Sequence, residues 1–224
     1  MINHHLSNEM ILAYAAGSLP VGQAMLARCH LDMCPHCQQR LFQAQMVGGA
    51  LLDDMEETVV ASSGFDQLMA ELDDPDQDAP IQFEDRAPVT KTSLIDNSVP
   101  SVLTEVMGHG LDEVKWKLVG PGIRQFVLPI ESPEGEKVRL LKLSPGFVTP
   151  QHSHHGCEMT LVLRGSFSDE SGRYKVGDIQ EADDDIDHQP VADTEEDCIC
   201  LTVTDAPLEF KNVMTRLLQP IVGI

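Results

Sequence analysis

The chain is short of basic residues: its 224 residues include 15 Lys and Arg against 36 Asp and Glu, which gives a formal net charge of −21 at pH 7. A field of this sign repels the phosphates of nucleic acids and of anionic membranes, so direct DNA or RNA binding is excluded from the expected functions. The same field favours a basic protein partner, such as the basic surface of a DNA-binding protein.

Long apolar runs are also missing. The chain opens with MINHHLSNEM instead of an apolar signal segment, and no run approaches the roughly 18 apolar residues that a membrane-spanning helix needs. We therefore expect a cytoplasmic protein with no membrane partner. In that compartment the cysteines are expected to be metal ligands or free thiols and not a disulfide framework. There are six of them: Cys29, Cys34, Cys37, Cys157, Cys198 and Cys200.

Helical periodicity marks the first 72 residues. One helix is expected to follow Ser7, a candidate N-cap, and a second periodic stretch runs from Leu41 to Leu52. A short amphipathic helix is expected last, with an apolar stripe of Phe65, Leu68, Met69 and Leu72 behind Ser62 and Ser63. A helix this short is marginal alone, so it either packs on its own domain or faces a partner.

A change of composition divides the chain. Residues 73–100 are rich in Asp, Pro, Ser and Thr, as linkers are, and twelve acidic residues but no basic one lie between Arg40 and Arg86. From about residue 106, short β-rich runs alternate with Pro and Gly, a pattern typical of an antiparallel sandwich or small barrel. The sequence predicts an α+β protein of two domains. Its parts are a small all-α domain (1–75), an acidic linker (76–105) and a β domain (106–224).

A nitrogen-and-thiolate cluster lies near the start, where His30, Cys34 and Cys37 have the spacing H-x3-C-x2-C. Pro35 lacks an N–H and clashes with a preceding helical turn, so we expect one helix to end near His30 and another to open at CPHC. A structural zinc takes four ligands at tetrahedral corners, with sulfur at about 2.3 Å and nitrogen at about 2.0–2.1 Å. The fourth ligand is expected from His5 or His4.

Two alternatives to structural zinc remain for this cluster. A Cys-x-x-Cys pair can act as a thiol switch without metal, but that interpretation calls for a βαβ context that the helical segment lacks. Coincidental spacing is the other alternative. Cys29 and His36 are expected to be bystanders.

A second cluster combines nitrogen and carboxylate donors. Residues 146–165 read G-x5-H-x-H-x3-E-x6-G, and His152, His154 and Glu158 share the parity that points side chains to one face of a strand. His188, from another strand, would complete a site of three imidazoles and one carboxylate. These ligands suit zinc, manganese, iron or nickel. The alternative without metal is a buried, hydrogen-bonded histidine cluster.

These segments carry a resemblance to known proteins. HHLSNEMILAYAAGSLP followed by HLDMCPHC resembles the zinc-binding domain of ECF-type anti-sigma factors, and GFVTPQHSHHGCEMTLVLRG resembles the first cupin motif. The whole chain resembles the ChrR family, which joins such a zinc domain to an antiparallel β cupin barrel. The resemblance implies a zinc site of His5, His30, Cys34 and Cys37. It also implies an ECF-type sigma factor as partner, and a metal-bound cupin domain that responds to an oxidative signal such as singlet oxygen.

The second cupin motif departs from its usual pattern. Gly177 begins it and His188 holds the ligand position, but Asp183 and Asp185 replace the usual Pro and Gly, and Ala192 replaces the terminal Asn. Metal binding is expected to survive these changes because His188 is kept. The acidic turn is expected to hold a dication and to disfavour anionic substrates.

We expect a regulatory protein and not an enzyme, because no convincing catalytic set accompanies the second cluster. One alternative is a cupin metalloenzyme, such as a dioxygenase, isomerase or decarboxylase, with a regulatory zinc domain. Another is a zinc-bound interaction module whose β domain serves dimerisation or stability. Cys198 and Cys200 would share one face of a strand and are expected to be buried, inert thiols; oxidation-sensitive thiols near the metal, with Cys157 as a third, are the alternative.

Overall fold

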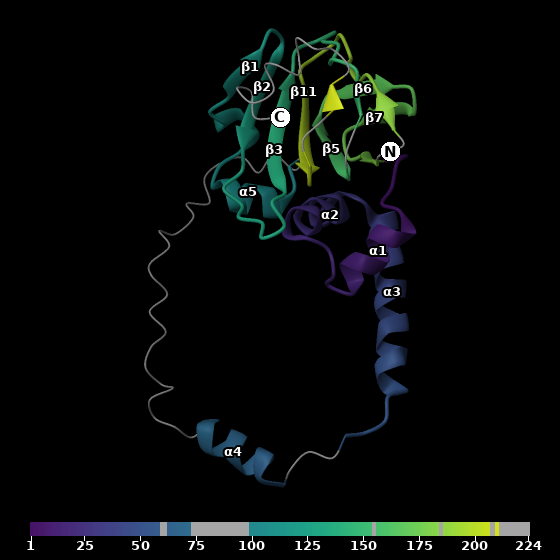
Figure 1. Ribbon diagram of the computed structural model, residues 1–224, viewed down its shortest axis with the longest axis vertical. Helices are drawn as coiled ribbons and strands as arrows, with labels where there is room; N and C mark the ends of the chain where they lie inside the picture. Colours follow the sequence, from purple (N-terminus) through teal and green to yellow (C-terminus); the bar gives the residue numbers. More distant parts are fainter. Residues whose placement is uncertain (59–61, 73–98, 154–155, 184–185, 207–208, 211–224) are drawn as a thin grey trace. The chain divides into compact units, whose positions relative to one another are not determined.

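Figure 1 shows the computed structural model, which describes residues 1–58, 62–72, 99–153, 156–183, 186–206 and 209–210. Residues 1–48 and 96–224 form one compact unit, and residues 49–95 form another. No helix within the described ranges is long and apolar enough to cross a membrane.

The N-terminal helices confirm the predicted N-cap and the predicted break between two helices. Helix α1 (Asn8–Ala15) starts after Ser7, whose side chain accepts a hydrogen bond from the backbone N of Met10 at 3.2 Å, which confirms the N-cap. Helix α2 (Val21–Met33) ends at an extended Cys34, and α3 (Pro35–Asp53) opens on Pro35, where a missing N–H costs nothing. The predicted break between the two helices is confirmed.

Helix α4 (Ser62–Leu72) matches the predicted short amphipathic helix. Its apolar side chains Phe65, Leu68 and Met69 are 67%, 54% and 41% exposed.

The C-terminal part is built from antiparallel sheets, as predicted. The largest has the strand order β1-β2-β3-β11-β5-β8. Its strands are β1 (Lys117–Gly120), β2 (Ile123–Val127), β3 (Lys137–Leu143), β11 (Cys198–Thr204), β5 (Glu158–Arg164) and β8 (Ile179–Ala182). Two three-stranded sheets accompany it. They are β10 (Val191–Ala192), β6 (Ser166–Asp169) and β7 (Gly172–Lys175), and β12 (Glu209–Phe210), β4 (His152–Ser153) and β9 (Asp187–His188).

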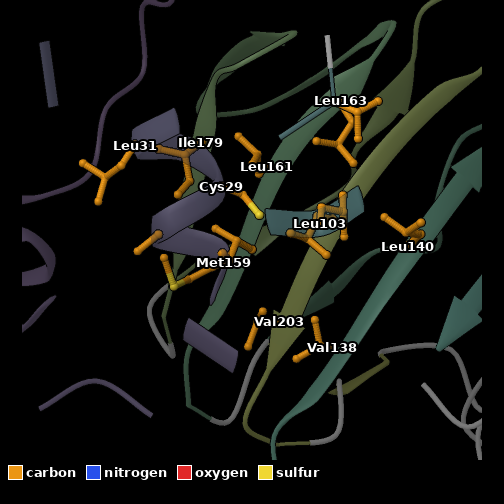
Figure 2. Packing of buried hydrophobic residues seen from close by; sticks show 14 of the residues in the cluster. Cys29, Leu31, Leu103, Val138, Leu140, Met159, Leu161, Leu163, Ile179 and Val203 are labelled. Atoms are coloured by element: carbon orange, nitrogen blue, oxygen red, sulfur yellow. The ribbon is translucent and has the colours of Figure 1, made fainter. Parts of the chain in front are cut away.

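Helices and sheet share one hydrophobic core. Alternate residues of β11, among them Leu201 and Val203, face a cluster that includes side chains from α1 and α2, while Cys198 and Cys200 face a second, smaller cluster on the other side. Figure 2 shows Cys29 of α2 close to Leu161 of β5. Burial raises the pKa of Cys29 to about 12, so this thiol behaves as an apolar packing group, as expected of a bystander.

Helix α2 approaches the sheet closely through a glycine. A Cβ at Gly22 would lie 2.9 Å from Val138 Cγ2 and 3.0 Å from Val203 Cγ1. The backbone N of Gly22 also donates to Glu136 Oε2 at 2.7 Å, so a buried carboxylate caps the start of α2. These contacts of Gly22 set the distance between the start of α2 and the strands β3 and β11.

Most of the expected linker (76–105), namely residues 76–98, lies outside the described residues. Its last five residues belong to α5 (Ser101–Met107), whose Leu103 is fully buried in the core. Ser101 Oγ donates to Asp32 Oδ2 of α2 at 3.0 Å. Helices α1 and α2 pack in the same unit as the sheet. The separation of residues 1–75 and 106–224 into two domains stays a prediction.

Candidate metal centres

Within the described residues, two groups of side chains bring metal-ligating atoms within 4.8 Å of one another. The first, named here the thiolate cluster, consists of His5, His30, Cys34 and Cys37. The second, named the carboxylate cluster, consists of His152, Glu158 and His188. These are the residues predicted from the sequence, except His154, which lies outside the described residues.

Three short segments assemble the thiolate cluster. His5 precedes α1, His30 lies in the last turn of α2, and Cys34 and Cys37 flank the start of α3. Nδ1 of His5 is 3.3 Å from Sγ of Cys34, and Nε2 of His30 is 3.3 Å from Sγ of Cys37. A tetrahedral zinc separates sulfur and nitrogen ligands by about 3.5 Å at its usual bond lengths. The four side chains therefore fit a closed structural site.

The structure places His5, and not His4, in the thiolate cluster. The ring centroid of His4 is 4.3 Å from that of Tyr174, and its Nδ1 is 3.5 Å from Asp178 Oδ2.

The surroundings of His30 prepare it for ligation. Its Nδ1 lies 2.9 Å from the carbonyl oxygen of Gly177, which can only accept a hydrogen bond. We therefore assign the hydrogen to Nδ1, so that the lone pair of Nε2 faces the cluster. Burial lowers the pKa of His30 to about 4, which keeps the ring neutral at pH 7. Burial also raises the pKa of Cys37 to about 11, so a nearby cation is needed to hold its thiolate form.

The carboxylate cluster is organised around two facing imidazoles. His152 of β4 pairs directly with His188 of β9, and their Nε2 atoms are 3.1 Å apart. Nδ1 of His152 lies 2.8 Å from the carbonyl oxygen of Pro150, and Nδ1 of His188 lies 2.8 Å from Asp169 Oδ2. The Pro150 carbonyl and the Asp169 carboxylate can only accept a hydrogen bond, so we assign the hydrogen of each ring to Nδ1. The lone pairs of the two Nε2 atoms then face each other.

Two facing lone pairs repel unless a cation lies between them. Metal–nitrogen bonds of about 2.0–2.1 Å place neighbouring nitrogen ligands about 3.0–3.4 Å apart in octahedral or tetrahedral sites. The observed Nε2 separation falls in that range. Burial lowers the pKa of His152 to about 4, which disfavours a proton as the bridging cation at neutral pH. The donor set therefore fits a metal ion.

Asp169 orients His188, a role that residue pattern does not reveal, because Asp169 is a single acidic residue in a β region. Its side chain is fully buried. Burial alone would raise the pKa of Asp169, but hydrogen bonds from His188, Ser171 and Gln180 outweigh it and hold the pKa well below its usual value. The carboxylate therefore stays ionised and fixes the ring, an arrangement common behind metal-bound histidines.

Glu158 supplies the negative charge of the carboxylate cluster from the first residue of β5. Its Oε1 accepts a hydrogen bond from Thr160 Oγ1 at 3.3 Å, while burial raises its pKa. A cation beside it would hold it ionised.

The two cysteines of β11 are buried, as predicted. The sulfur atoms of Cys198 and Cys200 are 3.6 Å apart and form no disulfide, which requires an S–S bond of about 2.05 Å. A hydrogen bond with Cys198, together with burial, raises the pKa of Cys200 well above its ordinary value. Both features are those of unreactive packing thiols.

A further surface feature is a set of exposed apolar side chains on the helices. After Arg40, helix α3 exposes large apolar side chains, and the loop that follows adds Met55. The exposed set along this segment, named the α3 stripe, is Phe42, Met46, Val47, Leu51, Leu52 and Met55, each 59–69% exposed. The corresponding α4 stripe is Phe65, Leu68 and Met69. Exposed apolar side chains gathered in this way are typical of protein-interaction sites.

Comparison with known proteins gives a consistent result. Residues 105–207 match the family model described as the ChrR cupin-like domain. The chain is 37% identical over 220 residues to the anti-sigma-E factor ChrR of Cereibacter sphaeroides, covering 98% of this chain and 97% of that protein.

A solved structure agrees. The crystal structure of Rhodobacter sphaeroides SigE in complex with the anti-sigma ChrR is similar with a TM-score of 0.73 and 34% identity, over 91% of this chain and 100% of the matched chain. The C-terminal sheets are thus a cupin domain, as the sequence resemblance implied. Similarity to an anti-sigma factor over nearly the whole chain supports a regulatory role over the enzyme alternative.

Proposed function

The chain belongs to the ChrR family of anti-sigma factors, and on that basis we propose that it binds an ECF-type sigma factor and keeps it from RNA polymerase. The observation that carries this proposal is the apolar surface of the α3 and α4 stripes. Helix α3 buries only Cys37 among its described residues, so most of its length is offered to a partner.

Charge supports the same partner. The segment that bears both stripes has acidic residues and no basic one between Arg40 and Arg86. DNA-binding proteins carry basic surfaces, and opposite charge raises the rate of encounter and fixes orientation. Apolar side chains framed by acids suit a helical, basic sigma domain better than they suit nucleic acid.

The thiolate cluster would hold Zn²⁺ and pin α1, α2 and the start of α3 to one another. The carboxylate cluster, completed by His154, would hold Zn²⁺ or another of Mn²⁺, Fe²⁺ and Ni²⁺. A cation bound there would supply charge that keeps Glu158 ionised, while His152 and His188 would hold it through their facing Nε2 atoms. We propose that the cupin domain is the input side of a cytoplasmic regulator, where an oxidative signal such as singlet oxygen alters this site and frees the sigma factor.

Substitution of exposed residues tests the binding surface. We expect Leu51→Asp and Phe65→Asp each to weaken binding of the full chain to its sigma factor by about 30-fold, the effect of losing a hot spot worth about 2 kcal/mol. Leu118→Asp is the matched control, because Leu118 is 66% exposed on β1, as Leu51 is on α3. Binding can be measured by isothermal titration calorimetry with the sigma factor that co-purifies with the native chain. Unchanged affinity in both helix variants, or an equal loss in the control, would refute this surface.

A further inference from the structure

Strand β8 and the turn before it form hydrogen bonds with residues of, or next to, both metal clusters. It pairs with β5, which begins with Glu158, and Glu158 lies directly across from Ala182 of β8. Successive residues of a strand face opposite sides, so one short strand can contact different surroundings on each face.

One face of β8 and the turn before it hold the segment that carries His5. The buried carboxylate of Asp178 accepts hydrogen bonds from the backbone N of Asn3 at 2.6 Å and of His4 at 3.0 Å. Further along, the backbone N of Ser7 donates to Glu181 Oε1 at 2.9 Å. Residues 3–7 are therefore attached to this strand on both sides of the His5 ligand.

The same turn also holds a second ligand of the thiolate cluster. The carbonyl oxygen of Gly177 accepts from Nδ1 of His30. A Cβ at Gly177 would lie 2.6 Å from Cδ1 of Ile2, so the N-terminal segment packs directly on the backbone there. A movement of residues 177–181 would thus displace both histidines of the thiolate cluster.

The opposite face of β8 reaches the carboxylate cluster. Gln180 Nε2 donates to Asp169 Oδ2 at 2.6 Å and to Ser171 Oγ at 3.0 Å. The same oxygen of Asp169 receives the hydrogen bond of His188. Gln180 lies between Ile179, whose backbone N contacts the His4 carbonyl at 3.4 Å, and Glu181, which holds Ser7.

We propose that β8 couples the two clusters, with Gln180 and Asp178 as positioning residues. A change in the carboxylate cluster moves His188 and Asp169, and the hydrogen bond from Gln180 to Asp169 then shifts β8. Because Asp178 and Glu181 are bonded to residues 3–7, this shift displaces the segment that holds His5. The coupling is reciprocal, so an ordered carboxylate cluster strengthens the hold of the thiolate cluster on its zinc. This inference rests on the proposed function, to which it adds a physical route from the cupin domain to the helices.

A double-mutant cycle on the full, zinc-loaded chain tests the coupling. The rate of zinc transfer to the chelator 4-(2-pyridylazo)resorcinol is measured in the wild type, His188→Ala, Gln180→Leu and the double variant, and the phase that is missing in Cys34→Ala is taken as release from the thiolate cluster. We expect His188→Ala to speed this release by about 5-fold or more, the lower end of typical couplings. In the Gln180→Leu background the same substitution is expected to add less than about 2-fold.

The matched control is Gln125→Leu, because Gln125 and Gln180 are 4% and 5% exposed in the same sheet, on β2 and β8. In the Gln125→Leu background the full effect of His188→Ala is expected. An equal effect of His188→Ala in all three backgrounds, or none in the wild type, overturns the proposal.

Hydrogen exchange gives a second readout that does not depend on the Gln180 variant folding well. The amides of Asn3, His4 and Ser7 are expected to exchange faster in His152→Ala, which empties the carboxylate cluster by another route, than in the wild type. Unchanged exchange overturns the coupling. Sigma-factor binding measured on the same wild-type sample separates the two ideas: intact binding with no coupling leaves the proposed function standing.

Discussion

The Nε2 atoms of His152 and His188 face each other at 3.1 Å, while each Nδ1 is engaged by an acceptor, the Pro150 carbonyl or the Asp169 carboxylate. Neither ring can turn to relieve the contact without losing a buried hydrogen bond. The pair is thus prepared for a cation, and this preparation is built into the strands β4 and β9 that carry the two residues.

Metal content should follow the two clusters separately. We expect about two metal ions per purified chain, with one lost in Cys34→Ala and the other lost in His152→Ala, because each substitution removes a ligand from only one cluster. Inductively coupled plasma mass spectrometry on the two variants and the wild type measures this. A single metal whose amount neither substitution changes would rule out the two-site account.

Asp169→Asn should weaken metal binding at the carboxylate cluster by about 10–100-fold, because the residue that orients His188 loses its charge. Competition with a chelator of known affinity measures the change. Asp193→Asn is a suitable control, since the Asp193 carboxylate also accepts a hydrogen bond from a side chain, that of Arg173, but contacts no residue named in the carboxylate cluster in that pair. Equal affinities for wild type and Asp169→Asn would show that the carboxylate does not tune the site.

The sequence predicted those parts of the structure that depend on local pattern. The break at Pro35, the Ser7 cap and the long strands β3, β5 and β11 follow from residue type and spacing. The two-residue strands β4 and β9 are too short to produce a periodic signal, although they carry His152 and His188. Asp169 and the Gly177 carbonyl could not be foreseen, because their roles arise from contacts between residues distant in the chain, and a carbonyl leaves no trace in the side-chain pattern.

Two glycines of the helices should respond in opposite ways to alanine. Gly22→Ala places a Cβ 2.9 Å from Val138 Cγ2, so we expect a loss of about 1–3 kcal/mol from overpacking. Gly48 lies in α3 with no heavy atom within 4 Å of an added Cβ, so Gly48→Ala is expected to stabilise its helix by about 0.5–1 kcal/mol. Urea unfolding followed by circular dichroism compares them. A stabilising Gly22→Ala would mean that α2 does not rest on the sheet as described.

Acid should destabilise the metal-free chain. Burial lowers the pKa of both His30 and His152 from 6.5 to about 4. Between pH 4 and pH 6.5 the unfolded chain binds more protons than the folded chain. The neutral form of each buried histidine therefore contributes on the order of 3 kcal/mol to the free energy of unfolding above pH 6.5, and this contribution is lost as the pH falls through 4. The urea concentration at the unfolding midpoint of the chelator-treated chain should be lower at pH 5 than at pH 7.5.

The exposed His36 serves as the control for this prediction, because His36→Gln removes an imidazole outside both clusters. That variant should show the same fall in the urea midpoint as the wild type. A midpoint that stays constant or rises toward pH 5 would contradict the burial of the two neutral imidazoles.

The most direct test of the account is transcription in vitro with RNA polymerase, the co-purifying ECF-type sigma factor and a promoter that depends on it. An anti-sigma factor that sequesters its partner predicts that transcript falls in proportion to the added zinc-loaded chain and disappears near one equivalent of sigma factor. Transcription that continues unchanged with several equivalents of the chain would contradict the central claim.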